Sequence, residues 1–578
     1  MMNGLSQKRY LELPLPTEDD PRSDQQRILD SLAAAGVEER VHIPVHILRE
    51  LYPLLDNAKW KITVSLAWNG DNWEMVEIEE GDTAAQHYGL AVDLGSTTVV
   101  ARLLDCNSGE ILKEVSCFNK QIQWGTDILS RIFYCKDNKE KLEEVRRATV
   151  ESICECMDKL DASLELQGTP SEQKAENNGV SESGDDRGAK NAAKKARTIS
   201  HSALSMVIAG NTTMIHFLLG MDAFCVFYTP HAVHADCPGF QLACDLDIPL
   251  KGYVYCYPAK SNYLGGDIIS GMIDTELYKK NEISVFFDIG TNGELVIGNK
   301  EFLLCGAGAA GPALEGGVVR TGMRADVGAV DEVKIRDGNI YVHVIGSHEE
   351  DSGRHEEDSG RHEEDSGSHE KNLGNHEDNS SGEEPRGICG SGIIDLIAEL
   401  FLEGWIDIRG KLSPEKSPLI QERDNQLCVE YAPGLYFYQK DIDEFIRTKS
   451  AAHTMVEIML RESGLDLNQA DRFYVAGAFG KHVSKESAIT IGMYPDMDRD
   501  HIINAGNSSL EGAQKLLLNR SLLTDIDQIL EEMVYIQFAE VEDFLKLMVA
   551  AQALPHTDYK RYPTVMKKLK ERQKDIKL

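Results

Sequence analysis

The 578-residue sequence lacks any apolar run of 18 or more residues, so it predicts no transmembrane helix and no membrane partner. Its first 21 residues are polar and acidic and contain no apolar signal core, and we therefore expect the chain to stay in the cytoplasm. Positive charge is scarce: 60 Lys and Arg face 95 Asp and Glu, a formal net charge of −35. Because a phosphate backbone needs a cationic surface, we expect no nucleic-acid partner.

The spacing of the cysteines also argues against a metal cluster. The twelve cysteines are scattered and form no C-x₂-C pair, so we predict neither a disulfide framework nor an iron–sulfur cluster in this chain. Cys154 and Cys156 lie on a predicted helix, where a two-residue offset turns their side chains about 200° apart. Cys237, Cys244 and Cys256 share one region, but a metal site there is disfavoured against three unrelated thiols.

A polar turn between two apolar strands is the first positive signal. Residues 90–92 lead to Asp93, a turn follows, and residues 99–104 leave it, as in a β-hairpin. The turn offers a glycine backbone and hydroxyls to a phosphate, and the aspartate could hold Mg²⁺ directly or through water. On its own the pattern is equally typical of an ordinary tight turn. The turn residues are Gly95, Ser96, Thr97 and Thr98.

The same pattern recurs a little under two hundred residues later. Asp288 to Thr291 (DIGT) repeats Asp93 to Ser96 (DLGS), again between two apolar strands, with Gly290, Thr291 and Asn292 in the turn. Two copies predict two related α/β halves that face each other across a ligand cleft.

Three further segments place polar groups where predicted strands end or helices begin. Gly210 and Asn211 follow a strand and either cap the next helix or donate to a ligand. Asp267 opens another helix, where it acts either as an N-cap or in catalysis. A small-residue turn follows the strand that starts at residue 472, and it consists of Gly477, Ala478, Phe479 and Gly480.

Two segments are interpreted as insertions. Residues 167–198 contain almost nothing apolar and read as disordered. Residues 346–385 contain a tandem acidic repeat with a histidine every seven residues, starting at His348. The histidines suggest metal binding, but a solvated repeat expansion is the favoured interpretation.

The combination of motifs resembles the reductive activators of corrinoid-dependent enzymes, within the actin, hexokinase and heat-shock-chaperone (ASKHA) superfamily. The resemblance covers about residues 9–552 apart from the insertions. Its motifs are NKQIQWGTDILSRI (119–132), GNTTM (210–214), AGPALEG (310–316), GMRA (322–325), GICGSGIID (387–395) and GNSSLEGA (506–513).

The resemblance implies an α/β fold, namely a duplicated ribonuclease-H-like ATPase behind a small α+β domain. We assign residues 1–40 to a linker and helix and residues 41–87 to the small middle domain. The first ATPase half is then 88–280, the second is 281–552, and residues 553–578 form a basic helical tail.

The family's chemistry is the ATP-driven reduction of Co(II) corrinoid proteins to Co(I). Carried over, it implies that Asp93 and Asp288 organise Mg²⁺ and the attacking water, and that Asp267 orients this water. The two turns, with Gly210 and Asn211, would hold the phosphates of ATP, and residues 477–480 would line the adenosine.

Two departures concern the electron path. Family members commonly carry a plant-type [2Fe–2S] domain ahead of the middle domain or clusters at the C-terminus, and a serine before the AGPALEG-like stretch, where this chain has Gly306, Ala307 and Gly308. We therefore expect a corrinoid protein and a separate ferredoxin-like electron donor as partners, and a homodimer stays open. A small-molecule kinase of the same superfamily and a non-catalytic, nucleotide-gated binding protein for corrinoid enzymes are the alternatives.

Overall fold

The protein consists of two compact units, each assembled from more than one segment of the chain. In the computed structural model, unit 1 comprises Met1–Glu276 and Ser508–Met533, and unit 2 comprises Leu277–Asn507 and Val534–Leu578. No helix among the described residues is both long and apolar enough to cross a membrane. The structure describes residues 3–125, 127–167, 199–227, 232–290, 293–308, 319–346, 383–466, 469–477, 482–538 and 541–573. The predicted insertions, 167–198 and 346–385, lie outside these ranges except at their edges.

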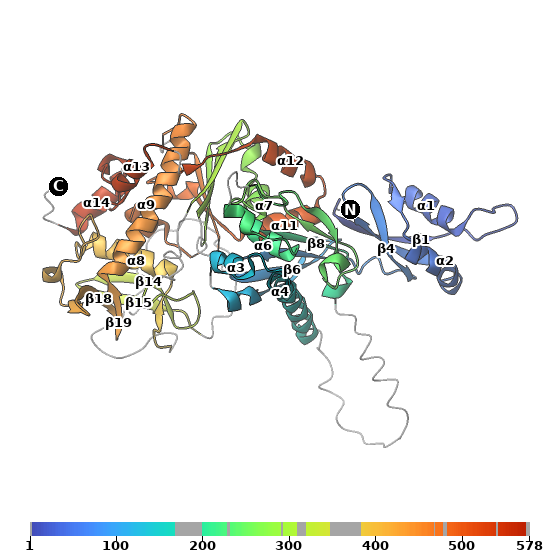
Figure 1. Cartoon of the computed structure of the whole chain (residues 1–578), viewed down its shortest axis with the longest axis horizontal. Coiled ribbons are helices and arrows are strands. Elements are labelled where there is room, and N and C mark those ends of the chain that lie inside the picture. The colour runs from blue at the N-terminus through green and yellow to red at the C-terminus, as the bar shows by residue number, and fades with distance from the viewer. Residues whose placement is uncertain are drawn as a thin grey trace, which may run out of the picture. The chain divides into compact units, whose positions relative to one another are not determined.

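Unit 1 begins with a small α+β module (Figure 1). Its four-stranded sheet has the order β1-β3-β4-β2, and helices α1 and α2 pack their apolar residues against it. Its strands are β1 (Ser6–Glu12), β2 (Val41–His42), β3 (Lys61–Trp68) and β4 (Trp73–Glu80), and its helices are α1 (Asp24–Ala34) and α2 (Val45–Asn57).

The predicted boundary at residue 40 is wrong. Strand β1 pairs antiparallel with β3 along its whole length, from Ser6 opposite Ala67 to Glu12 opposite Lys61, and Ile28 and Leu32 of α1 lie in the same core. The segment 6–12 is rich in polar residues, and its alternation is weak because Lys8 is buried and pairs with Glu79. Residues 1–40 therefore include part of the module and are not merely a linker with a helix.

The remainder of unit 1 is built on a six-stranded sheet of order β7-β6-β5-β8-β10-β9. Strand β6 is antiparallel to β5 and to β7, whereas β8 runs parallel to β5 and β10 runs parallel to β8. The strands are β5 (Tyr88–Leu94), β6 (Thr98–Asp105), β7 (Ile111–Phe118), β8 (Ser205–Gly210), β9 (Gly239–Leu242) and β10 (Tyr253–Cys256). The helices around them are α3 (Ile128–Cys135), α4 (Lys139–Gln167), α6 (Thr212–Leu218) and α7 (Gly266–Thr275).

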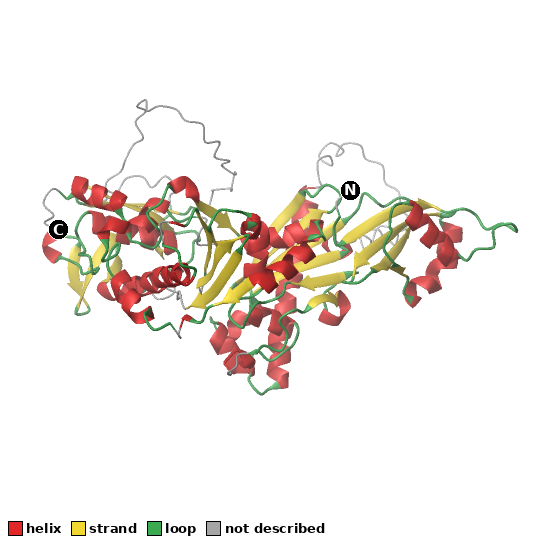
Figure 2. Ribbon diagram, turned by 90° about the horizontal axis from the view of Figure 1, so that it is seen from above, coloured by secondary structure: helices red, strands yellow, loops and turns green. Residues whose placement is uncertain are grey.

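Unit 2 repeats this topology in a sheet of order β21-β20-β11-β12-β13-β22. Strand β11 again forms a hairpin with β12 and lies parallel to β20, so the order β13-β12-β11-β20-β21 matches β7-β6-β5-β8-β10. The strands are β11 (Ser284–Ile289), β12 (Gly293–Asn299), β13 (Phe302–Gly308), β20 (Arg472–Ala476), β21 (Ile502–Gly506) and β22 (Met533–Tyr535). This repetition confirms the predicted α/β class and its duplicated ribonuclease-H-like design. Figure 2 shows the helices and strands that make up this mixed fold.

Two helices that the predicted boundaries assign to the second half belong to unit 1. They are α11 (Ser508–Leu518) and α12 (Leu522–Glu532). Helix α11 packs on α7, and a side chain at Gly512 would collide with the carbonyl oxygen of Ser270, so the close approach of the two helices requires glycine here. The Tyr257 hydroxyl donates to the carbonyl oxygen of Gly512 at 2.9 Å and fixes the same contact.

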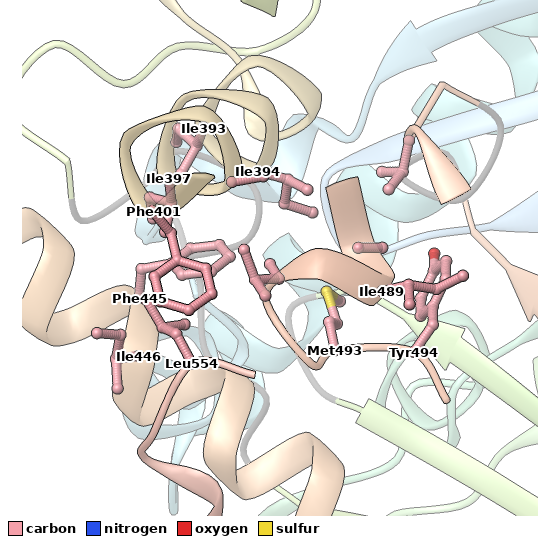
Figure 3. Close-up of a cluster of buried hydrophobic side chains, with 14 of the residues drawn as sticks. Ile393, Ile394, Ile397, Phe401, Phe445, Ile446, Ile489, Met493, Tyr494 and Leu554 are labelled. Atoms are coloured by element: carbon pink, nitrogen blue, oxygen red, sulfur yellow. The ribbon is translucent and has the colours of Figure 1, made fainter. Parts of the chain in front are cut away.

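Besides its six-stranded sheet, unit 2 contains two three-stranded sheets and several helices. Their apolar residues form one core with the face of that sheet, and Figure 3 shows side chains of α8 and α9 meeting Leu554 within it. The small sheets are β14 (Ala329–Arg336), β15 (Asn339–Val344) and β16 (Gly387–Ile388), and β17 (Ile420–Arg423), β18 (Gln426–Ala432) and β19 (Leu435–Tyr438). The helices are α8 (Gly390–Leu402), α9 (Gln439–Glu462), α10 (Lys485–Thr490), α13 (Phe544–Ala551) and α14 (Pro563–Arg572).

The C-terminal segment is helical as predicted but is packed into unit 2. Leu554, Tyr562, Val565 and Leu569 are buried in the core. The fully buried Lys449 ammonium donates to three backbone carbonyls of this segment, those of Ala551 (2.7 Å), Ala553 (2.9 Å) and Pro555 (2.6 Å). These bonds tie the segment to α9 and satisfy carbonyls at the end of α13.

Candidate functional site

The turn that follows Asp93 is held from behind by the 119–132 motif. Asn119 donates its side-chain amide to the carbonyl oxygen of Gly95 (2.9 Å) and its backbone N–H to that of Thr97 (2.9 Å). Between them, the Ser96 carbonyl accepts from Nη1 of the fully buried Arg131 (2.5 Å). Three consecutive carbonyls of the turn are thus occupied within the protein.

Arg131 connects this turn to the start of α3. Its Nε donates to the carbonyl oxygen of Gly125 (2.9 Å) and its Nη1 also reaches Oε1 of Gln121 (3.2 Å). Burial lowers the pKa of Arg131 to about 10, which leaves the guanidinium charged at neutral pH. A fixed positive charge behind a glycine and hydroxyl turn favours an anion in front of it.

Asp93 is the second-to-last residue of β5, and its carboxylate is held by α11. The Ser509 hydroxyl donates to Asp93 Oδ1 at 3.0 Å. Ser509 is itself buried, and its carbonyl oxygen accepts from the Ser270 hydroxyl of α7 at 2.6 Å. We did not predict Ser509 as a site residue, although it lies in the GNSSLEGA motif. Ser509 and Asp93 are so far apart in the sequence that no local spacing could have linked them.

Asp267 lies near Asp93 in the same unit, at the second residue of α7. Gly265 is the N-cap of this helix, so the alternative expectation that Asp267 caps it is wrong. Burial, reinforced by the negative charge of Asp93, raises the pKa of Asp267 to about 7, although the Ile268 amide donates to its Oδ1 at 2.9 Å. A carboxyl group with this pKa can accept a proton from water near neutral pH.

Gly210 and Asn211 complete this end of the sheet. Gly210 pairs with Leu94, so β8 and β5 end side by side. The Asn211 side chain accepts from the backbone N–H of Met214 (3.0 Å) and caps α6. Capping engages the amide oxygen of Asn211 and leaves the ligand-donating role of its side-chain nitrogen as a prediction.

Asp288 occupies the corresponding place in unit 2, as the second-to-last residue of β11. It lies opposite Ala476 in the parallel pair, and the following residue, Gly477, has a φ of +90°. A Cβ at Gly477 would lie 2.8 Å from Asp288 Oδ1, so glycine gives the carboxylate room at the strand end. The N–H of Gly477 donates to the Gly506 carbonyl (2.9 Å), which brings the end of β21 to the same place.

Several predicted site residues lie outside the described residues, and their roles remain predictions. Gly290, the last described residue before the second turn, is partly buried. The undescribed residues are Thr291, Asn292, Ala478, Phe479 and Gly480.

One group of buried side chains has the composition of a metal site, among the residues that the structure describes. The ligand atoms of His453, Glu457 and His556 lie within 4.8 Å of one another. However, Arg561 Nη1 lies 3.1 Å from Glu457 Oε2 and already supplies a cation. The N–H of Asp558 donates to His556 Nδ1 (2.9 Å), so Nδ1 carries no proton and the proton of the neutral ring is on Nε2. Because Nδ1 is engaged and Nε2 is protonated, neither nitrogen of His556 is free to bind a metal. We interpret the cluster as an anchor for the C-terminal segment.

The two related sheets, each with an aspartate at the end of its first strand, define a protein of the ASKHA class. Family models match nearly the whole chain: the linker region of RACo at residues 1–85, its middle region at 88–170 and 186–280, and its C-terminal ASKHA domain at 282–566. The chain belongs to the RACo family.

Individual relatives agree with this assignment. A solved structure of a reductive activator for corrinoid,iron-sulfur protein is 31% identical, with a TM-score of 0.79 over 98% of this chain and 81% of that one. The corrinoid activation enzyme RamQ of Eubacterium limosum is 27% identical over 451 residues, which are 75% of this chain and 64% of the relative. The [Co(II) methylated amine-specific corrinoid protein] reductase of Methanosarcina barkeri is 27% identical over 289 residues, 50% of this chain and 49% of that protein. The chain thus spans about half to two thirds of the length of these two curated relatives.

Proposed function

We propose that this protein is an ATP-dependent reductive activator that returns a corrinoid protein of a methyltransferase system from Co(II) to Co(I). The observation that carries the proposal is that Asp93 at the end of β5 lies beside Asp267 of α7 and Ser509 of α11, in a RACo-family chain with an ASKHA fold. The names of the relatives support the corrinoid protein as partner.

The chemistry of the donor set fits ATP with Mg²⁺. Hard oxygen ligands such as the carboxylates of Asp93 and Asp288 suit Mg²⁺, which usually keeps several of its waters. When bound, Mg²⁺ would neutralise phosphate charge and orient the substrate. The Arg131-backed turn at 95–98 is proposed to bind phosphate oxygens, and the turn at 290–292 and residues 477–480 are proposed to contact phosphate and adenosine.

Proton transfer falls to Asp267 in this proposal. Ser509 donates a hydrogen bond to the Asp93 carboxylate, and the negative charge of Asp93 helps to raise the pKa of Asp267. A carboxylate poised near neutral pH can orient the attacking water and accept its proton as the phosphoanhydride bond breaks. Asp267 is therefore the proposed general base.

ATP must supply free energy to the electron transfer. Moving one electron against ~200 mV costs about 4.6 kcal/mol. Nucleotide binding and hydrolysis can provide that amount if the protein binds the redox states of the corrinoid partner with different affinities. We propose that the electron comes from a separate iron–sulfur protein, in agreement with the lack of cluster spacing among the cysteines.

The test combines hydrolysis with cobalt reduction. The purified full chain is incubated with a Co(II) corrinoid protein, Ti(III) citrate as electron source and Mg-ATP, and the loss of the Co(II) electron paramagnetic resonance signal is followed beside phosphate release. We expect Co(II) loss only with ATP, and faster phosphate release when the corrinoid protein is present. A rate of ATP hydrolysis that is the same with and without the corrinoid protein would contradict the proposal.

Variants identify the site. Asp93→Asn and Asp288→Asn should each abolish both signals. The matched controls Asp137→Asn and Asp337→Asn replace exposed aspartates in left-handed turns, a conformation that asparagine also adopts, and should behave as wild type. Phosphate transfer to a metabolite would favour a kinase, and normal corrinoid-protein activation by the hydrolysis-deficient variants would favour a nucleotide-gated binding protein.

A further inference from the structure

Two buried cysteines meet beside the 95–98 turn. Cys117 is the second-to-last residue of β7 and Cys156 lies in α4, and their sulfur atoms are 3.2 Å apart. Cys117 is 5% exposed and Cys156 is fully buried. The Cys117 thiol also lies 3.2 Å from the Ser152 carbonyl oxygen, one turn earlier in α4. A disulfide bond needs the two sulfurs at about 2.05 Å, so closure requires an approach of only about 1.1 Å.

The two thiols of this pair are chemically different. The hydrogen bond from Cys156 lowers the pKa of Cys117, whereas the same contact and burial raise the pKa of Cys156. The nearby charges act on both thiols alike: the Lys159 ammonium, which donates to the Ser116 carbonyl at 3.2 Å, lowers both pKa values and Glu155 raises both, so the difference comes from the sulfur–sulfur contact and burial. Cys117 is thus the thiol that ionises first, and the thiolate is the form that reacts with oxidants.

Three other buried cysteines differ from Cys117 in the direction of the pKa shift. Burial raises the pKa of Cys106 and of Cys256 to about 12 and that of Cys135 to about 11, which keeps them protonated and unreactive. The position of Cys117 also differs, because β7 is the edge strand of its sheet and α4 packs against both β7 and β6. Of the two cysteines, only Cys117 keeps any exposed surface, so an oxidant meets Cys117 first.

We propose that Cys117 and Cys156 form a reversible oxidation site for peroxide. The Cys117 thiolate attacks one oxygen of hydrogen peroxide, the O–O bond breaks, and Cys117 becomes a sulfenic acid while hydroxide leaves. The Cys156 sulfur then attacks Cys117 Sγ, the S–O bond breaks, and a disulfide and water form. In total, two thiols lose two electrons and two protons, and one peroxide becomes two waters. A dithiol reductant reverses the step by thiol–disulfide exchange.

The site adjoins the turn that is proposed to bind phosphate. Cys117 pairs with Val99, the residue after the turn, and Asn119 two positions on holds Gly95 and Thr97. Ser152 accepts from the N–H of Lys120 (2.9 Å), so α4 contacts the same segment. Pulling α4 against β7 would disturb these contacts, and we expect the disulfide form to bind ATP at least several-fold more weakly. This consequence, unlike the oxidation site itself, rests on the proposed function.

The experiment uses the full chain with the exposed Cys237 and Cys244 replaced by serine, which removes competing surface thiols. After peroxide treatment and quenching, free thiols are alkylated and the digest is analysed by mass spectrometry before and after dithiothreitol. We expect loss of two alkylatable thiols and one cross-linked peptide pair, Cys117–Cys156, with full recovery on reduction. Cys154→Ser, two residues away on α4, should leave this result unchanged, whereas Cys117→Ser and Cys156→Ser should abolish it.

Two outcomes would overturn the oxidation site: both cysteines fully alkylated after treatment, or stable sulfinic acid on Cys117 with Cys156 still free. The parent protein alone gives this result, so the conclusion does not depend on the folding of a variant. Isothermal titration calorimetry with a non-hydrolysable ATP analogue is then carried out on the dithiol form and on the disulfide form. A disulfide with unchanged analogue affinity would refute the coupling to the turn, and no binding by either form would refute the proposed function while the oxidation site stands.

Discussion

Ser509 donates a hydrogen bond of 3.0 Å to Asp93 across 416 residues of sequence. The donor belongs to the first turn of α11 and the acceptor to the end of β5, and both lie in unit 1. Ser270 of α7 holds the Ser509 backbone from the other side. The orientation of the proposed catalytic carboxylate therefore depends on the packing of two helices.

Replacing Ser509 with alanine should slow ATP hydrolysis by about 10- to 100-fold, since a hydrogen bond to a charged group contributes about 1.5–3 kcal/mol. Ser509 touches Asp93 and acts as a positioning residue, so Ser509→Thr, which keeps the hydroxyl, should restore most of kcat. Steady-state kinetics test this, with thermal denaturation to verify that both variants are folded. Equal rates for the two variants would show that the hydroxyl is irrelevant.

Asp267 should give the hydrolysis rate a pH dependence. If it accepts a proton with a pKa of about 7, kcat rises as the pH increases from 6 to 8 and is level above that. Asp267→Asn should lower kcat by about 100-fold or more and abolish the dependence. A pH–rate profile of wild type and variant measures both effects, and an unchanged profile in the variant would exclude Asp267 as the base.

Asp267 should also make the stability of the protein depend on pH, with the opposite sign to the hydrolysis rate. The folded-state pKa is raised above the ordinary value of 3.8, so the folded protein binds more protons between pH 4 and 7, and this contribution is lost as the pH rises through about 7. Asp267→Asn removes a partly buried charge and should raise the Tm at pH 8 but not at pH 5. A Tm that is lowered at pH 8 would contradict this account.

Arg131→Lys should be disruptive even though it retains the charge. A lysine ammonium cannot reach the carbonyls of both Ser96 and Gly125, and the Gln121 contact is also lost. We expect the free energy of unfolding to fall by about 2–4 kcal/mol, measured by urea denaturation, and affinity for the ATP analogue to fall with it. The matched control is Arg147→Lys on the exposed surface of α4, which should leave both quantities unchanged.

The histidines that anchor the C-terminal segment predict acid sensitivity. Burial and the nearby Arg561 and Lys449 charges lower the pKa of His556 to about 4, and burial lowers that of His453 as well. The folded state therefore binds fewer protons than the unfolded state, and stability that is complete above pH 6.5 is lost as the pH falls toward 4. For His556 alone, this loss in the free energy of unfolding is at most about 3 kcal/mol.

His556→Asn tests this origin of the acid sensitivity, because asparagine can still accept the Asp558 N–H but does not titrate. The variant should show a smaller loss of Tm between pH 7 and 4.5 than the wild type, measured by differential scanning calorimetry. The exposed His501→Gln serves as the control and should follow the wild type. Identical slopes in all three proteins would place the sensitivity elsewhere.

The two phosphate-type hairpins could be predicted because local signals agree: an apolar strand, an aspartate one residue before its end, and a glycine turn. The Asp93–Ser509 contact could not, because its two residues are separated by most of the chain. Strand β1 was missed since Lys8 is buried in a position where alternation predicts an apolar residue. Asp267 was considered as an N-cap from local sequence, but α7 begins at Gly266 and its N-cap is Gly265, which packs closely against Asn211.

The return of residues 508–533 to unit 1 has a consequence for how the protein is made. During synthesis, β5 and its turn leave the ribosome long before α11, and the chain must first produce most of unit 2. Until then Asp93 lacks its serine and α7 lacks the helix that covers it. Unit 1 is therefore completed late, and a fragment ending at residue 276 would display an exposed helix-binding surface and an unsupported carboxylate where the full-length protein has a finished site.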